Sequence, residues 1–221
     1  MAKVKAVIFD MDGTVADPLA SIAGFGNAAH KAHGYPEIGT ERYRQLGGNG
    51  ADVLMRRMLE TAKAGQPYSE DEVQAPRATY DALYESDPTR LVAPYPGIPA
   101  LLRAVREAGV KTAVLSNKPD NMTCFIADAL FPGLFDIVHG QRTGVPKKPD
   151  PAAVFEICDA LGVQPAQCLY VGDSGVDMQT GANAGVPTAG VTWGFRGAEE
   201  LRQNGADHLV DSAEALGRLI L

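Results

Sequence analysis

The chain has 221 residues, 45% apolar and 21% charged, which is the composition of a globular protein rather than a disordered one. Its net charge of -7 argues against nucleic acid or an anionic membrane surface as a partner, because both attract basic faces. No apolar run reaches the roughly 18 residues of a membrane-spanning helix, and the N-terminus lacks a signal-peptide pattern. Three widely spaced cysteines are typical of reduced core residues, so we expect a cytoplasmic protein.

The first predicted element is a short strand over residues 4–9, apolar enough to be buried on both faces. The pattern then becomes purely helical, with helices predicted over residues 18–34, 51–65 and 69–86. We expect Asp17 to be the N-cap of the first of these helices and Pro18 its first helical residue. Pro76 lies inside the third helix, where it is expected to kink or split the helix.

From residue 89 onward, strands and helices alternate. Strands are predicted over residues 111–116, 135–140, 168–172, 188–193 and 208–210. Helices are predicted over residues 98–108, 119–130, 151–161, 175–184 and 198–204, with one more at the C-terminus. Alternation of this kind predicts a three-layer, Rossmann-like α/β fold around a parallel sheet. The N-terminal strand has a partner only in that sheet. We therefore expect a core domain of residues 1–15 and 89–221, with residues 16–88 inserted as an α-helical domain.

Polar residues gather where the predicted strands end. The clusters are Asp10 with Asp12, Ser116 with Asn117, Lys147 with Lys148, and Asp173 with Ser174 and Asp177. Each cluster alone is commonly a helix cap, a turn or a solvated surface. In open parallel sheets, however, ligands bind beyond the carboxyl ends of the strands, and the fold brings these clusters to that edge. Their joint placement therefore predicts a functional site.

The residue types at this edge indicate phosphate chemistry. Clustered carboxylates repel one another and need a cation, and oxygen ligands without histidine or cysteine suit Mg²⁺. A lysine and a hydroxyl group beside the metal can hold phosphate oxygens. Asp10 is then a candidate nucleophile that forms an aspartyl-phosphate, and Asp12 is a candidate general acid and base.

Four short motifs carry a family resemblance. They resemble, in order, the four motifs of the haloacid dehalogenase (HAD) superfamily. The four are Asp-x-Asp-Gly-Thr after the first strand, a serine at a later strand end, Lys-Pro-x-Pro, and Gly-Asp-Ser-x-x-Asp. The inserted helical domain is similar to the small α-helical cap of that superfamily. The stretches YRQLGGNG, VTWGF and GADHLVDSAEAL resemble its phosphoglycolate phosphatase subgroup. The resemblance implies a Mg²⁺-dependent phosphatase acting on a small phosphorylated metabolite, for which 2-phosphoglycolate is the best single expectation.

The resemblance also implies roles for the carboxylates. Asp10 would be the nucleophile and a Mg²⁺ ligand, and Asp12 would be the acid and base and bind Mg²⁺ through its backbone carbonyl. Asp173 would complete the metal ligands, and Asp177 would act on the metal indirectly or through water. Ser174 would support this carboxylate pair.

The remaining implied roles concern the phosphate. Ser116 and the backbone N–H of Asn117 would hold it, and Lys148 would bridge it to the nucleophile. Lys147 is the alternative for that role, although Lys148 directly precedes Pro-x-Pro. Thr14 would order the loop after the first strand.

Several interpretations stay open. A cap loop that selects the substrate would place Gly47, Gly48 and Asn49 in contact with it. Other capped members of the superfamily are alternatives: a sugar-phosphate phosphatase, a pyrophosphatase or a β-phosphoglucomutase-like phosphotransferase. A receiver-like phosphorylated switch is a further alternative, which the helical insertion and Asp12 disfavour. The oligomeric state is expected to be monomer or homodimer. His30 is expected at the surface or at a helix end.

Overall fold

A computed structural model of the protein describes residues 4–48 and 50–221. The chain divides into two compact units, which we call the core unit (residues up to Asp17 together with Pro94–Leu221) and the helical unit (Pro18–Ala93). The two connections between the units include the strands β2 (Ala16–Asp17) and β3 (Ala93–Pro94), which pair in a two-stranded sheet. The chain therefore leaves the core unit and returns to it along neighbouring segments.

The core unit is built on a six-stranded parallel sheet in the order β5-β4-β1-β6-β7-β8. Its strands are β1 (Ala6–Phe9), β4 (Lys111–Pro119), β5 (Ile137–Gln141), β6 (Cys168–Gly172), β7 (Thr188–Val191) and β8 (His208–Val210). All four residues of β1 are fully buried because the strand lies between β4 and β6 and is covered on both faces. The predicted parallel α/β core is confirmed, and β1 occupies its centre.

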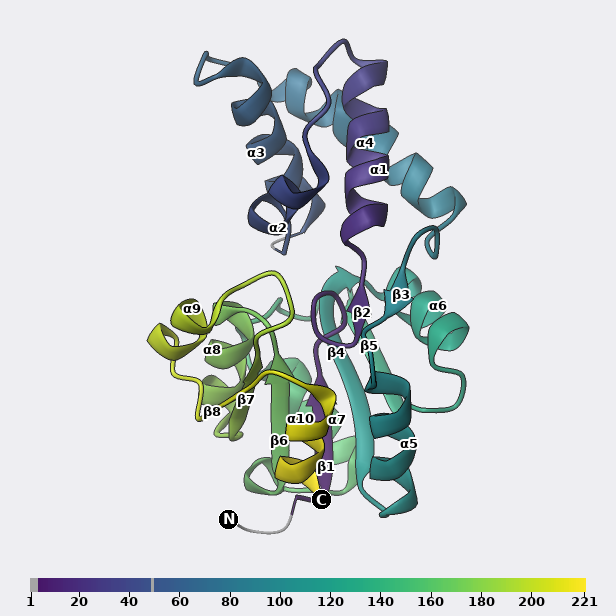
Figure 1. Ribbon diagram of the computed structural model, residues 1–221, viewed down its shortest axis with the longest axis vertical. Helices are drawn as coiled ribbons and strands as arrows, with labels where there is room; N and C mark the ends of the chain where they lie inside the picture. The colour runs from purple at the N-terminus through teal and green to yellow at the C-terminus, as the bar shows by residue number, and fades with distance from the viewer. Residues whose placement is uncertain (1–3, 49) are drawn as a thin grey trace. The chain divides into compact units, whose positions relative to one another are not determined.

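Helices cover both faces of this sheet (Figure 1). They are α5 (Ile98–Glu107), α6 (Asp120–Leu130), α7 (Ala152–Leu161), α8 (Gly175–Ala184), α9 (Ala198–Gln203) and α10 (Ala213–Ile220). The helices α5 and α10 pack together, as do α7, α8 and α9 in sequence. Ile8 and Tyr170 belong to the buried cluster that includes Val154 and Ile157 of α7. Among the described residues, no helix is long and apolar enough to cross a membrane.

The helical unit contains α1 (Leu19–Ala32), α2 (Tyr43–Leu46), α3 (Ala51–Lys63) and α4 (Glu70–Ser86). A short 3₁₀ helix over Thr40–Arg42 directly precedes α2. Ser69 and Glu72 form a reciprocal capping box at the start of α4. The helix continues through Pro76 as one element, so it is not split there, and a kink at this residue stays a prediction.

The predicted start of α1 is wrong by one position. The helix begins at Leu19, its N-cap is Pro18, and Asp17 lies in β2. The reason is that Ala16 and Asp17 take an extended conformation to pair with β3, which the sequence pattern did not reveal. Asp17 therefore belongs to the connection between the units rather than to the helix.

His30 lies in the last turn of α1, but it is not at the surface. Its side chain is fully buried on α1, with Nδ1 3.3 Å from the carbonyl oxygen of Pro36 and the ring centroid 5.3 Å from that of Tyr35. Burial lowers the pKa of His30 below its ordinary value. Of the two predicted positions for this histidine, the surface is wrong, whereas the helix end is confirmed, because His30 lies in the last turn of α1.

Candidate active site

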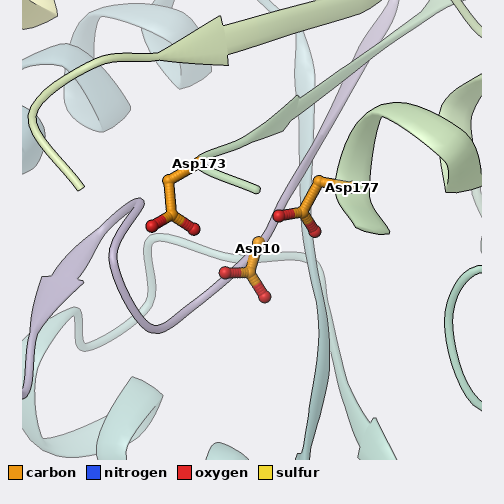
Figure 2. A group of neighbouring side chains, drawn as sticks. All are labelled: Asp10, Asp173 and Asp177. Carbon is orange, nitrogen blue, oxygen red and sulfur yellow. The ribbon is translucent and has the colours of Figure 1, made fainter. Parts of the chain in front are cut away.

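Three carboxylates meet beyond the carboxyl ends of β1 and β6. Asp10 follows the last residue of β1, Asp173 follows the last residue of β6, and Asp177 lies in the first turn of α8. Figure 2 shows the three side chains pointing toward one another. One oxygen from each lies within 4.8 Å of the others. Parallel pairing of β1 with β6 brings the strand ends to one edge, so residues far apart in the sequence become neighbours.

Lys148 links two of these three carboxylates. Its Nζ donates a hydrogen bond of 2.7 Å to Oδ1 of Asp10 and another of 2.7 Å to Oδ1 of Asp177. All three residues are buried, with 9% or less of each exposed. Burial opposes the charge of Lys148, but the two carboxylates outweigh it and raise its pKa well above the ordinary value. The lysine therefore stays protonated and links the two acids.

Asp10 is a carboxylate that the core unit makes hard to ionise. Burial raises the pKa of Asp10 from 3.8 to about 7, and the negative charges of Asp177 and Asp12 act in the same direction. Lys148 opposes this shift but does not cancel it. A carboxyl group with such a pKa needs additional positive charge nearby before it is fully ionised at neutral pH.

Asp177 is fixed through both of its oxygens. While Oδ1 accepts from Lys148, Oδ2 accepts from the backbone N–H of Ser174 at 3.1 Å and from its hydroxyl at 2.6 Å. Ser174 is the N-cap of α8, so the contact also gives the backbone N–H of the N-cap residue a partner. Gly172 makes room for this arrangement, because a Cβ there would lie 2.2 Å from Cβ of Asp177.

Asp173 is packed tightly between two glycines. A Cβ on Gly13 would lie 2.2 Å from Oδ2 of Asp173, and one on Gly194 would lie 2.4 Å from the same atom. Gly13 also has a φ of +93°, which favours glycine. The backbone N–H of Phe195 donates to Oδ2 at 2.6 Å. Burial, followed by the charges of Asp10 and Asp177, raises the pKa of Asp173 well above its ordinary value.

This group of carboxylates fits a divalent cation. Three buried acids face one lysine, and two of them have raised pKa values, so the cluster lacks positive charge. The donor set consists of carboxylate oxygens, which hard cations such as Mg²⁺ prefer. The predicted ligands Asp10 and Asp173 both belong to the cluster, whereas the side chain of Asp12 points to a different partner, Lys118.

The residues predicted to hold phosphate lie near the end of β4, and one of them, Asn117, contacts Lys148. Ser116 is buried on β4, and its hydroxyl accepts from the backbone N–H of Lys118 at 3.2 Å. The side chain of Asn117 holds the backbone of Lys148, donating from Nδ2 to its carbonyl at 3.2 Å and accepting its N–H at 2.9 Å. Lys147 is exposed, in contrast to its neighbour. Asn117 thus positions the lysine as well as being a candidate phosphate contact.

Two further contacts around the loop after β1 were not foreseen. Lys118 Nζ lies 3.0 Å from Oδ1 and 2.9 Å from Oδ2 of Asp12. Trp193 donates from Nε1 to the backbone carbonyl of Thr14 at 3.0 Å, and Thr14 itself is buried. The available signal for Lys118 was its position directly after Ser-Asn. The sequence pattern ended that strand at Ser116, whereas β4 continues to Pro119.

The predicted substrate-selecting loop belongs to the helical unit. Gly47 ends α2, and Gly48 follows with a φ of +90°. Asn49 lies outside the residues that the structure describes. A role for this loop in substrate selection stays a prediction.

The fold and this site define a class of protein. The family model of haloacid dehalogenase-like hydrolases matches residues 4–185, and the chain belongs to that family. It is 31% identical over 224 residues to the phosphoglycolate phosphatase of Vibrio vulnificus (strain YJ016), covering 99% of this chain and 97% of that protein. It is also 32% identical to the N-acetylmuramic acid 6-phosphate phosphatase of Pseudomonas aeruginosa, covering 97% of this chain and 93% of that protein.

Solved structures show the same architecture. A protein from Lactobacillus delbrueckii subsp. bulgaricus, provisionally named a phosphoglycolate phosphatase, superposes with a TM-score of 0.94 at 34% identity and covers 99% of both chains. A similarly named protein from Haemophilus somnus 129PT gives a TM-score of 0.90 at 28% identity over the whole of both chains. The family match favours an enzyme over a receiver-like switch.

Proposed function

We propose that the protein is a Mg²⁺-dependent phosphatase that hydrolyses a small organic phosphate monoester through an aspartyl-phosphate, with 2-phosphoglycolate as the preferred substrate. The observation that carries the proposal is the buried Lys148 ammonium, which contacts Asp10 and Asp177 beside Asp173 at the carboxyl edge of the sheet. This arrangement combines a carboxylate nucleophile, a cation for phosphate oxygens and a cluster for a metal.

In the first step, a carboxylate oxygen of Asp10 attacks phosphorus and the bond from phosphorus to the ester oxygen breaks. Asp12 gives its proton to the departing alkoxide, which leaves as the alcohol. Lys148, held next to Asp10, attracts the phosphoryl oxygens and stabilises their charge. Ser116 and the backbone N–H of Asn117 would donate hydrogen bonds to the same group.

In the second step, water attacks the phosphorus of the aspartyl-phosphate. Asp12, now a carboxylate, takes a proton from that water, and the bond from phosphorus to Asp10 breaks. Inorganic phosphate leaves, and Asp10 returns as a free carboxylate. The same side chain thus serves as the acid in one step and the base in the next.

Asp10 and Asp173 would hold Mg²⁺ together with the backbone carbonyl of Asp12, and Asp177 would act on it indirectly. When bound, the ion supplies positive charge that reduces repulsion between the nucleophile and the phosphoryl group. The raised pKa values of Asp10 and Asp173 support this assignment, because a cation favours the ionised forms that burial disfavours.

The choice of substrate rests on relatives. Several relatives at 31–35% identity are named phosphoglycolate phosphatase. The relative named for N-acetylmuramic acid 6-phosphate supports a sugar phosphate as the second candidate. Either substrate is a small phosphorylated metabolite, consistent with a cytoplasmic enzyme. The helical unit would serve as the cap, and its loop at Gly47 and Gly48 would discriminate between the two substrates.

The test is a kcat/KM panel in Mg²⁺ with 2-phosphoglycolate, N-acetylmuramic acid 6-phosphate, pyrophosphate and β-glucose 1-phosphate. We expect 2-phosphoglycolate to exceed the others by at least about 10²-fold, the scale of discrimination that one shaped pocket provides. A sugar phosphate that leads the panel by this margin would replace the proposed substrate.

The nucleophile is tested separately with Asp10→Asn. The amide keeps the size of the side chain but cannot form the acyl phosphate. We expect turnover of every substrate in the panel to fall by at least about 10⁴-fold. Substantial remaining turnover would contradict the assignment of Asp10.

A further inference from the structure

Lys118 makes a contact that the proposed chemistry does not yet use. Its ammonium lies within 3.0 Å of both carboxylate oxygens of Asp12, although the two residues are 106 positions apart. The side chain of Lys118 is 10% exposed and that of Asp12 is 21% exposed. Screening by water is therefore weaker here than at an exposed ion pair.

The backbone around Lys118 explains why the side chain reaches this place. The pairing of β4 with β5 is regular up to Leu115 and resumes at Pro119, with a shift in register between them. Irregularities of this kind re-aim side chains near the ends of strands. Here the shifted segment is Ser116–Lys118, which carries all of the polar side chains that β4 contributes to the site.

Two further contacts fix that segment. The N–H of Lys118 donates to the hydroxyl of Ser116 at 3.2 Å, and its carbonyl accepts from the hydroxyl of Thr123 at 3.3 Å. A Cβ on Gly140 would lie 2.6 Å from the carbonyl oxygen of Lys118, so β5 approaches it closely. Lys118 is thus anchored on the sheet, whereas Asp12 lies in the turn that follows β1.

We propose that Lys118 is a positioning residue that fixes the carboxyl group of Asp12 for proton transfer to the leaving group. The inference rests on the proposed function of Asp12 as general acid. A lysine that reaches both oxygens continues to donate to one of them when the other carries the proton. The orientation of the acid is then preserved while its proton moves to the ester oxygen.

The experiment compares Lys118→Met, which keeps length and loses the donors, with Lys118→Arg. The matched control is Lys111→Met at the opposite end of β4, where the lysine is half exposed and 3.7 Å from Asp136. kcat/KM is measured in Mg²⁺ with phenyl phosphate and p-nitrophenyl phosphate. Phenolate is a poor leaving group that needs a proton, whereas p-nitrophenolate leaves readily without one. Neither substrate carries a carboxylate that Lys118 could bind instead.

We expect Lys118→Met to lower kcat/KM by about 10²-fold for phenyl phosphate and by less than about 3-fold for p-nitrophenyl phosphate, since misplacing an acid matters only where a proton is needed. Lys118→Arg retains donors to the carboxylate and should lie closer to the wild type. Lys111→Met should leave both values unchanged.

Equal losses on both esters, or no loss on either, would overturn the positioning role. The proposed function fails in a different way: the wild type would hydrolyse neither these esters nor any member of the substrate panel, or Asp10→Asn would retain turnover, and the inference about Lys118 would fall with it. Thermal denaturation of each variant separates misfolding from a selective kinetic effect. A selective loss on phenyl phosphate at unchanged Tm is the result that a purely structural lysine does not produce.

Discussion

Both units contain partly exposed ion pairs, but among the described residues a buried group of paired charges occurs in the core unit. In the core unit, Asp10, Lys148 and Asp177 are buried together at the end of the sheet. In the helical unit, the described ion pairs are partly exposed: Arg56 with Glu70, Lys63 with Glu72, and Arg77 with Asp81. The buried charges of the core unit are therefore held together without hydration, whereas water partly screens the charges of the helical unit.

Burial decides how much each pair matters. An exposed pair contributes between about 0 and 1 kcal/mol, because water screens it and the side chains lose entropy. A buried pair costs several kcal/mol per ion in lost hydration, and its partners are strongly coupled as a result. The core unit therefore contains buried charges that lower its stability, as is expected at a site where these charges take part in chemistry.

Among the changes that test this comparison between the two units, Lys148→Met should have the largest effect. The change leaves the charges of Asp10 and Asp177 without their shared cation, so we expect turnover to fall by about 10³-fold, as for loss of one preorganised donor. Stability should fall by roughly 3–5 kcal/mol, the usual cost of breaking a buried pair on one side. Steady-state kinetics and urea denaturation measure the two quantities.

The neighbouring lysine provides the control for this prediction. Lys147 is exposed and adjacent in sequence, so Lys147→Met should change neither turnover nor stability by more than the error of measurement. If Lys147→Met abolishes turnover and Lys148→Met does not, the assignment of the phosphate-contacting lysine is reversed.

A second effect concerns pH and Mg²⁺ in the core unit. The pKa of Asp10 is raised from 3.8 to about 7 in the folded protein, so the folded state holds this proton more tightly than the unfolded chain does. Without a metal, the free energy of unfolding therefore falls as pH rises from about 4 to about 7. Mg²⁺ binds the ionised form, and its stabilisation should therefore grow as pH rises toward about 8. At a concentration of about 100 Kd the gain is about 2.7 kcal/mol.

Thermal denaturation at several pH values, with and without Mg²⁺, measures this dependence. The variant Asp173→Asn removes one carboxylate from the cluster and should lose most of the increase in Tm. An increase that is the same at about pH 5 and about pH 8 would show that Asp10 does not take part in binding the ion.

Much of the core unit could be predicted from the sequence because its signals are local. Four apolar residues before Asp10 indicate a buried strand, and β6 and α8 have the bounds that the pattern assigned. Alternation of strands and helices then fixes a parallel sheet, and the sheet fixes which strand ends meet. That is why Asp10, Asp173 and Asp177 could be placed at one edge in advance.

The remaining details depend on contacts between distant segments. The sequence does not show that Lys118 meets Asp12, because the meeting depends on a shift in the pairing of β4 with β5. Nor does it show that Gly194 must lack a side chain to admit Asp173, since the two residues approach only after folding. The strand at Asp17 likewise exists only because β3 pairs with it.

The smallest expected effect is the pH dependence of stability in the helical unit, and its sign is opposite to that of the metal-free core unit. Burial, supported by the neighbouring charge of His33, lowers the pKa of His30 below its ordinary value of 6.5. The unfolded chain therefore takes up a proton more readily than the folded unit. Stability due to neutral His30 is present above about pH 6.5 and is lost as pH falls below it, whereas Asp10 weakens the metal-free core as pH rises.

Hydrogen exchange measured by mass spectrometry, corrected for intrinsic rates, can follow the two units separately. Peptides from α1 and α4 should lose protection between about pH 7 and about pH 5 in the wild type, and His30→Gln should remove this loss because an amide does not titrate. His33→Gln is the matched control, since His33 is exposed and its Nε2 lies 2.8 Å from the hydroxyl of Thr79. If both variants flatten the pH dependence equally, surface charge rather than burial of His30 controls it. If only His30→Gln does so, the helical unit contains one buried group that responds to acid, and its many exposed charges contribute little to the response.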